Sequence, residues 1–265
     1  MHLLKMGDIM IQFNNVFYKY PEEDNFVFSN LNIEIPEGIT SLVGQNGTGK
    51  TTFLLLSAGL LIPEQGDVLI LTANTKQIKT AQDRQQIVSF IYQNMEFESE
   101  DSINSLLKIV YANGFHTNKT DSFIKELIDV FELSSFLNRR TQEISKGELQ
   151  RVIIAFSLLF GSKLLIMDEP IFALEDYQKK KTMNYLRDYS IKNKISIVYS
   201  AHELDITKQY SDNVCFFHKN KIPEIGKTDT IFIESKLEDV FNIPFPMLKQ
   251  KEYLYRESLV QTNLY

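Results

Sequence analysis

The sequence carries, at residues 44–52, the stretch Gly44-Gln45-Asn46-Gly47-Thr48-Gly49-Lys50-Thr51-Thr52. This stretch matches the phosphate-binding pattern G-x-x-x-x-G-K-[ST], whose fixed positions are filled by Gly44, Gly49, Lys50 and Thr51. Residues 39–43 before it form a short β-branched run typical of a buried strand, and residues 52–60 after it favour a helix. A strand, a glycine-rich loop and a helix start place backbone N–H groups around an anion. The stretch therefore predicts a phosphate-binding site.

Two side chains of this stretch suit the groups that accompany a phosphate chain. Lys50 adds a point charge for the outer phosphates. The hydroxyl of Thr51 is placed to ligate Mg²⁺. The competing interpretation is a glycine-rich turn that matches by chance, and the strand-to-helix setting disfavours it.

Composition and charge limit the classes of function. The chain has 265 residues, of which 43% are hydrophobic and 23% charged, as in an ordinary globular protein with a sizeable core. The net charge of −6 comes with no basic stripe, so no nucleic-acid partner is expected. The run Lys179-Lys180-Lys181 is interpreted as a solvated helix face. Cys215 is the only cysteine, which excludes an internal disulfide and a cysteine metal cluster.

The sequence predicts no direct membrane span. The N-terminal residues 1–8 lack the apolar core of a signal peptide. The apolar run at 152–160 is much shorter than the roughly 20 residues that cross a bilayer. If the protein works at a membrane, another chain must supply the membrane part.

Hydrophobic periodicity predicts an α/β chain with a helical insert. Expected strands lie at 9–13, 26–28, 31–35, 39–43, 68–71, 87–92, 164–167, 195–199 and, as the last clear strand, 214–217. Expected helices lie at 52–60, twice within 101–142, from about Ser145 to Gly161, and at 175–193. Ser145 is the expected N-cap of its helix, because Glu148 follows at the capping-box spacing.

Asp168 and Glu169 directly follow the continuously apolar run 164–167, which is typical of a central parallel strand. We expect this strand to lie next to the phosphate-loop strand, where ligands collect in open α/β sheets. Two adjacent carboxylates beside a phosphate loop suit Mg²⁺ binding and activation of a water molecule. Taken alone, the pair is equally well explained as the cap of a following helix.

Five motifs follow one another along the chain. They are the phosphate loop at 44–52, Gln93 after a strand, residues 145–151 at a helix start, residues 164–170, and His202 after a strand. This order resembles the nucleotide-binding subunit of ATP-binding cassette (ABC) transporters over roughly residues 9–225. The resemblance implies a P-loop NTPase core with a mostly parallel sheet, an N-terminal antiparallel β subdomain and a small helical insert. It also implies one ABC ATPase domain over 1–265, divided into a core at 9–93 and 143–225, a helical subdomain at 94–142 and a C-terminal extension at 226–265.

The same resemblance implies ATP and Mg²⁺ as cofactors and assigns residues to them. Expected ATP contacts are Tyr20 (or Tyr18) on the adenine, Gly44, Asn46, Gly47, Gly49, Lys50, Thr51 and Thr52. Asp168 and Gln93 join Thr51 on the Mg²⁺ side, and Gln93 also couples the site to the helical insert. Glu169 looks like the general base that polarises the attacking water, and His202 like the histidine that contacts the γ-phosphate.

Ser145 and Gly147 resemble the family's signature motif, which binds the γ-phosphate held by the opposite subunit. The resemblance therefore implies a head-to-tail dimer around two ATP, formed with a second copy or a paralogous ATPase. Three positions depart from the common pattern: Lys146 stands for glycine, Glu148 for glutamine and Glu175 for aspartate. We expect a working site in which these departures alter the cross-interface geometry.

The leading hypothesis is an ATPase that drives a separate transmembrane permease subunit from the cytoplasmic face of the cell membrane. The tail from residue 226 resembles that of ATPases from importers of iron chelates and cobalamin. Three alternatives stay open: a soluble ABC ATPase acting on nucleic acid or ribosomes, a nucleotide-dependent regulator with little turnover, and a small-molecule kinase on a P-loop fold. The kinase explains the phosphate loop but neither residues 143–151 nor residues 168–175.

Overall fold

The computed structural model describes residues 9–219 and 222–250. The N-terminal stretch 1–8 and the last part of the predicted C-terminal extension, 251–265, therefore lie outside the described residues.

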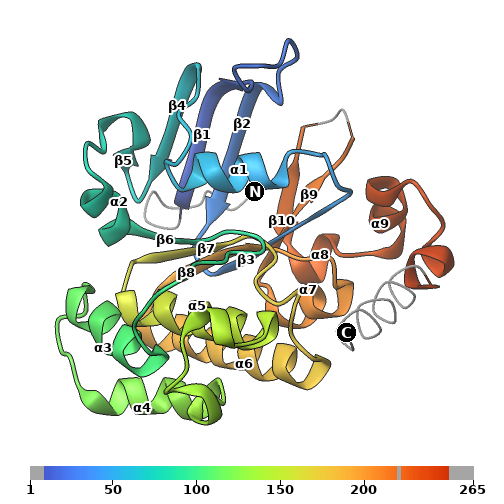
Figure 1. The fold of residues 1–265 in the computed structure, drawn as a ribbon. Helices are drawn as coiled ribbons and strands as arrows, with labels where there is room; N and C mark the ends of the chain where they lie inside the picture. Colours follow the sequence, from blue (N-terminus) through green and yellow to red (C-terminus); the bar gives the residue numbers. More distant parts are fainter. Residues whose placement is uncertain (1–8, 220–221, 251–265) are drawn as a thin grey trace.

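Two β-sheets form the frame of the molecule (Figure 1). The smaller sheet is antiparallel and has the order β2-β1-β4-β5. Its strands are β1 (Ile9–Tyr18), β2 (Phe28–Pro36), β4 (Gln65–Ile70) and β5 (Ala73–Asn74). This sheet is the predicted N-terminal antiparallel subdomain.

The larger sheet has the order β10-β9-β3-β8-β7-β6. Its strands are β3 (Ile39–Gly44), β6 (Val88–Ile91), β7 (Leu164–Met167), β8 (Ser196–Ser200), β9 (Asn213–Phe217) and β10 (Glu224–Lys227). All neighbours pair in parallel except β10, which runs antiparallel to β9. The carboxyl ends of five parallel strands consequently meet along one edge, where a ligand site is expected.

The helices cover both faces of the larger sheet. Figure 1 shows α1 (Lys50–Ser57) between the two sheets, and α5 (Lys146–Phe160) with α6 (Asp176–Asn193) on the opposite face. The remaining helices are α2 (Ala81–Ile87), α3 (Ile103–Asn113), α4 (Asp121–Val130), α7 (Leu204–Tyr210), α8 (Thr228–Ile231) and α9 (Glu234–Phe241). In the described ranges, no helix is both long and apolar enough to cross a membrane.

The core follows from the alternation of side chains along β7. Leu164 and Ile166 pack with α1 and the small sheet, whereas Leu165 and Met167 pack with α5 and α6. All four are buried, as expected for a strand covered on both faces. On the α1 side, the rings of Phe13 in β1 and Phe53 in α1 stack with centroids 4.5 Å apart, which fixes α1 against the small sheet.

The predicted fold class is confirmed, and three details of the prediction are wrong. The strand that carries Asp168 is not next to the phosphate-loop strand, because β8 lies between β3 and β7. The predicted last clear strand, 214–217, is followed within the described residues by β10, which is short and only half-buried and so has no apolar run to mark it. Lys179 is not solvated, since its ammonium is buried 2.8 Å from Glu203.

Candidate active site

The phosphate loop joins β3 to α1, and glycine is required at two of its positions. At Gly44 an added Cβ would lie 2.4 Å from the carbonyl oxygen of Phe217 in β9, so the strand and the loop could not pack as they do. At Gly49, the N-cap of α1, φ is +95°, a conformation that favours glycine. The loop thus depends on these glycines for its shape as well as for access to a phosphate. Asn46 and Gly47 lie exposed at its tip.

Lys50, the first residue of α1, is buried under the loop. Its Nζ donates to the carbonyls of Gly44 at 2.8 Å and Gln45 at 2.9 Å. Burial lowers the pKa of the ammonium, and the nearby carboxylates of Glu169 and Asp168 oppose that shift. The loop therefore holds a cation close to the predicted general base Glu169 and the predicted Mg²⁺ ligand Asp168.

Thr51 and Asp168 meet across the sheet edge. The Thr51 hydroxyl donates to Oδ2 of Asp168 at 2.7 Å, and the Asp168 side chain is buried. A hydroxyl and a carboxylate beside a phosphate loop are the hard oxygen donors that Mg²⁺ prefers, so this pair fits the predicted metal. In the described residues, no group of three or more histidine, cysteine, aspartate or glutamate side chains is arranged to hold a metal ion.

Ser200, at the end of β8, links the two carboxylate residues and was not singled out from the sequence. Its hydroxyl makes a short hydrogen bond to Oδ1 of Asp168 and accepts the backbone N–H of Glu169 at 2.9 Å. The side chain is fully buried. The only signal in the sequence was a serine at the end of a buried strand, two residues before His202.

Glu169 and His202 form a direct pair. Nε2 of His202 lies 2.7 Å from Oε1 of Glu169. The other carboxylate oxygen, Oε2, is buried, and it has no hydrogen-bond partner in the described part of the chain. Glu169 thus keeps one oxygen oriented by a histidine and the other available to accept a proton. We call Thr51, Asp168, Glu169, Ser200 and His202 the carboxylate cluster.

Two further predicted residues border this cluster. The Tyr20 hydroxyl lies 3.0 Å from the hydroxyl of Thr52, whereas Tyr18 is buried in the core, so Tyr20 is the better placed of the two tyrosines. Gln93 is exposed in the turn after β6. It lies two residues after Ile91, whose carbonyl accepts the backbone N–H of Asp168 at 2.9 Å. The roles of Tyr20 on adenine and Gln93 on Mg²⁺ stay predictions.

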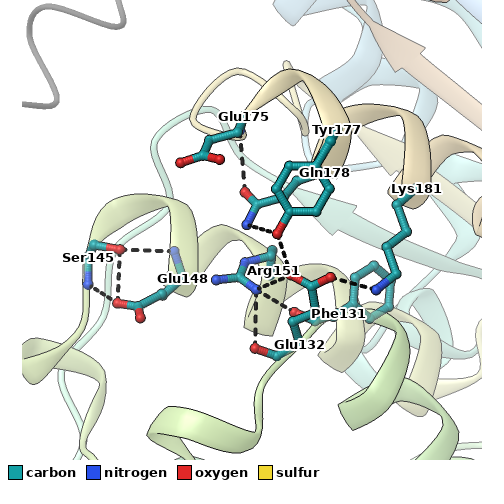
Figure 2. Close-up of polar contacts among 9 residues, drawn as sticks. All are labelled: Phe131, Glu132, Ser145, Glu148, Arg151, Glu175, Tyr177, Gln178 and Lys181. Atoms are coloured by element: carbon teal, nitrogen blue, oxygen red, sulfur yellow. Dashed lines mark hydrogen bonds and ion pairs between the residues drawn. The ribbon is translucent and has the colours of Figure 1, made fainter.

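The start of α5 is not joined to the carboxylate cluster. Ser145 caps the helix as predicted: its hydroxyl and backbone N–H both contact the Glu148 carboxylate, at 2.9 and 2.8 Å (Figure 2). In the ranges that the structure describes, its side-chain hydrogen bonds go to Glu148 alone. At Gly147, an added Cβ would lie 2.8 Å from the carbonyl oxygen of Ala173. We call residues 145–148 the signature end.

The departures from the family pattern lie on the surface around the signature end. Lys146 is exposed and pairs with Glu96 at 3.2 Å. Glu148 supplies the capping carboxylate just described. Glu175 is the N-cap residue of α6, and its backbone N–H donates to Gln178 at 3.3 Å (Figure 2). These three residues therefore leave the starts of α5 and α6 accessible to a partner protein.

Polar contacts around Glu132 connect α5 to the helical insert and to α6 (Figure 2). Glu132 accepts from the Tyr177 hydroxyl at 2.6 Å and from Lys181 at 2.7 Å, both on α6. Arg151 of α5 donates to the carbonyls of Phe131 at 2.7 Å and Glu132 at 3.2 Å. The hydrogen bond from Lys181, followed by the one from Tyr177, holds the pKa of Glu132 below its usual value. The helical insert, α5 and α6 are therefore tied together behind the signature end.

The phosphate loop also contacts the C-terminal part of the chain. Nε2 of Gln45 lies 2.7 Å from the carbonyl of Phe241 and 3.3 Å from that of Val240. Because the last carbonyls of a helix have no partner within it, Gln45 caps the C-terminus of α9. No local pattern in the sequence indicates this contact.

A protein-family model and two relatives of known type resemble this chain over most of its length or over half of it. A protein-family model described as "ABC transporter" matches residues 28–172. The petrobactin import ATP-binding protein FatE of Bacillus anthracis is 27% identical over 91% of this chain and 96% of its own length. The phosphonates import ATP-binding protein PhnC of Treponema denticola is 25% identical over 88% of this chain and 95% of its own.

Solved structures agree at the level of the fold. The ATP-binding cassette MJ0796, described as a dimer in a post-hydrolysis state bound to ADP and Pi, matches with a TM-score of 0.72 and 21% identity. The match covers 83% of this chain and 99% of that one. A structure described as the ATP-binding subunit of an ABC transporter matches with a TM-score of 0.72 and 20% identity, over 92% and 99% of the two chains.

Proposed function

Because this chain belongs to the ABC transporter family as an ATP-hydrolysing subunit, we propose that it closes as a dimer around two ATP molecules and drives a separate transmembrane permease subunit. The observation that carries the proposal is the hydrogen-bonded path from the phosphate loop into the carboxylate cluster. Thr51 contacts Asp168, Ser200 joins Asp168 to Glu169, and Glu169 contacts His202. One path thus connects the residues that bind phosphate to the predicted general base.

Each residue of the path has a chemical role in the proposal. Lys50 and the loop amides hold the β- and γ-phosphates. Thr51 and Asp168, with Gln93, hold Mg²⁺, which when bound neutralises charge on the phosphates. Oε2 of Glu169 accepts a proton from the attacking water, while the ring N–H of His202 orients the carboxylate through Oε1.

The proposed dimer supplies what the signature end lacks in one copy. Ser145 and Gly147 lie at the N-terminus of a 15-residue helix, whose free N–H groups and dipole favour an anion. In the proposal they contact the γ-phosphate held by the phosphate loop of a second copy or of a paralogous ATPase. The dimeric description of the MJ0796 cassette supports this arrangement.

The permease is proposed to dock beside Gln93, which places the protein on the cytoplasmic face of the membrane. A hollow of about 330 Å³ opens next to the end of β6. Its lining is largely apolar and includes Tyr92, Met95, Phe97 and Phe156. Tyr92 lines the hollow and directly precedes Gln93 in the chain. A permease segment bound in the hollow is therefore proposed to shift Gln93, on the Mg²⁺ side of the site. In this proposal residues 94–142 form the coupling subdomain, and residues 9–93 and 143–225 form the core.

For the cargo we propose a metal chelate of the iron-chelate or cobalamin type. The match to the petrobactin import protein FatE over 96% of its length supports import, and the resemblance of the tail from residue 226 supports this kind of cargo. Phosphonate or methionine, named for other relatives, are the alternatives that an experiment must distinguish.

The test uses Glu169→Gln, which keeps the shape of the side chain and removes the base. Hydrolysis of Mg-ATP is expected to fall about 10²- to 10⁴-fold, the usual contribution of a general base, while ATP binding persists. The ATP-loaded variant, used to capture partners from native membranes, is expected to retain a multi-span protein, whose identity narrows the cargo. Unchanged hydrolysis in Glu169→Gln contradicts the catalytic assignment. A soluble partner or nucleic acid in place of the permease contradicts the transport assignment.

A further inference from the structure

Ser200 links Asp168 to Glu169, but neither the motif pattern nor the proposed mechanism assigns it a role in the reaction. It is the last residue of β8, the strand between the phosphate-loop strand β3 and the carboxylate strand β7. It is 0% exposed, so its hydroxyl is shielded from bulk solvent and bonds to protein groups. Those groups are Oδ1 of Asp168 and the backbone N–H of Glu169 at 2.9 Å.

The contact with Glu169 matters because of the backbone there. Glu169 has φ of +50°, a left-handed conformation that is uncommon for residues other than glycine. Such a conformation persists only where the surroundings hold it. The Ser200 hydroxyl accepts the N–H of this residue and thereby fixes the point from which its side chain extends toward His202.

The contact with Asp168 has a complementary effect. Thr51 donates to Oδ2 and Ser200 to Oδ1, so each carboxylate oxygen is held by one hydroxyl. The plane of the carboxylate is therefore fixed from both sides. Losing one of the two hydroxyls leaves the carboxylate free to turn.

We propose that Ser200 is a positioning residue for ATP hydrolysis, which sets the backbone of Glu169 and the carboxylate of Asp168 relative to each other. This inference rests on the proposed roles of Asp168 and Glu169. A buried serine could also serve packing alone, and Ser41 provides the comparison. Ser41 lies in the adjacent strand β3, is also 0% exposed, and bonds the hydroxyl of Thr207 at 2.9 Å instead of a carboxylate.

The experiment compares Ser200→Ala, Ser200→Thr and the control Ser41→Ala in the full chain. Ser200→Ala is expected to lower kcat about 10- to 100-fold, the size of effect that misplacement of a catalytic group produces, and to leave KM for ATP within about threefold. Ser200→Thr restores the hydroxyl and is expected to recover most of kcat. If the extra methyl of threonine prevents folding, Ser200→Cys, which keeps the size but donates weakly, is expected to lie between alanine and wild type.

A second measurement avoids hydrolysis altogether. The thermal unfolding midpoint is measured with ATP plus Mg²⁺ and with ATP plus EDTA. Ser200→Ala is expected to lose part of the Mg²⁺-dependent increase and to keep the increase produced by ATP with EDTA, because the phosphate loop is unchanged. Ser41→Ala is expected to keep both increases.

Two results overturn the inference: a kcat for Ser200→Ala no lower than for Ser41→Ala, or a loss of ATP binding in EDTA equal to the loss in Mg²⁺. Wild type and Glu169→Gln are assayed alongside. If Glu169→Gln hydrolyses ATP like wild type, the proposed function fails. If it is inactive while Ser200→Ala matches wild type, only the role of Ser200 fails.

Discussion

The carboxylate cluster and the signature end differ in what holds their side chains in place. In the carboxylate cluster, residues from α1 and from the ends of β7 and β8 hydrogen-bond to one another in a largely buried setting. At the signature end, Ser145 is exposed, and within the part of the chain that the structure describes its side chain hydrogen-bonds only to Glu148 of its own helix start. The side chains of the carboxylate cluster are thus held by residues of the same chain. The signature end instead presents a helix N-terminus that is open to solvent.

This difference separates two kinds of function. Changes in the carboxylate cluster are expected to act within one copy of the chain, on binding or on chemistry. Changes at the signature end are expected to leave nucleotide binding by one copy intact and to act where a second copy is needed. The following predictions test that separation, in order of expected effect.

The largest effect is expected for Lys50→Ala. Its buried ammonium makes charge-assisted contacts worth about 1.5–3 kcal/mol each, so ATP affinity should fall about 10- to 100-fold. Titration of the single chain with a fluorescent ATP analogue measures this loss without hydrolysis. Lys163→Ala, at an exposed position between α5 and β7, is the matched control. Equal ATP affinity in the Lys50 and Lys163 variants would contradict the prediction that Lys50 binds the nucleotide within one copy of the chain.

An intermediate effect is expected for Ser145→Ala. Its matched control is Ser102→Ala, because both serines are N-caps that accept a backbone N–H at 3.3 Å, Ser102 at the start of α3. Both substitutions should lower the free energy of unfolding by about 1 kcal/mol, the usual value of such a cap. Only Ser145→Ala should also lower ATP hydrolysis, by about 10-fold for one lost phosphate contact of about 1.4 kcal/mol.

Denaturant unfolding and steady-state hydrolysis measure the two quantities separately. Equal hydrolysis in the Ser145 and Ser102 variants would mean that Ser145 is only a cap. The signature end would then have no role across an interface.

The smallest effect is expected for Glu132→Gln, behind the signature end. The pKa of Glu132 is lowered in the folded protein, so its stabilisation is present above the usual value of 4.5 and is lost as pH falls through the lower folded value. Since the pair with Lys181 is partly exposed, the variant should lose about 1 kcal/mol or less at neutral pH. Urea unfolding across the acid range measures this, with Glu126→Gln, whose carboxylate accepts from Tyr185 of α6, as the control. A difference from wild type that stays constant with pH would contradict it.

Local features of the sequence predicted most of the site. The phosphate loop, the capping box at Ser145 and the buried strand before Asp168 each follow from residues within a few positions of one another. The order of motifs added His202, and the structure brings it to Glu169. The sequence could indicate these positions because the determining interactions are short-range or recur in a fixed order along the chain, and the roles of the residues stay predictions.

Apart from β10, which lacks an apolar run, the missed features depend on contacts between distant segments. That β8 lies between β3 and β7 is a property of strand pairing and not of any one strand. Lys179 is buried because Glu203, 24 residues away, provides a partner. Ser200 has an ordinary local sequence, and its importance comes from lying beside Asp168, 32 residues earlier.

Mutations at Gln45 and at the end of α9 are expected to affect the same contact. The residues joined by its two hydrogen bonds are 195 and 196 positions apart in the chain. Substitution that removes the Gln45 amide and a stop codon before residue 240 abolish the same pair of bonds, although the stop codon also removes the buried Val240 and Leu248. The two alleles are therefore expected to share a phenotype that originates at the phosphate loop. A suppressor screen begun with a Gln45 missense allele should return changes near the end of α9.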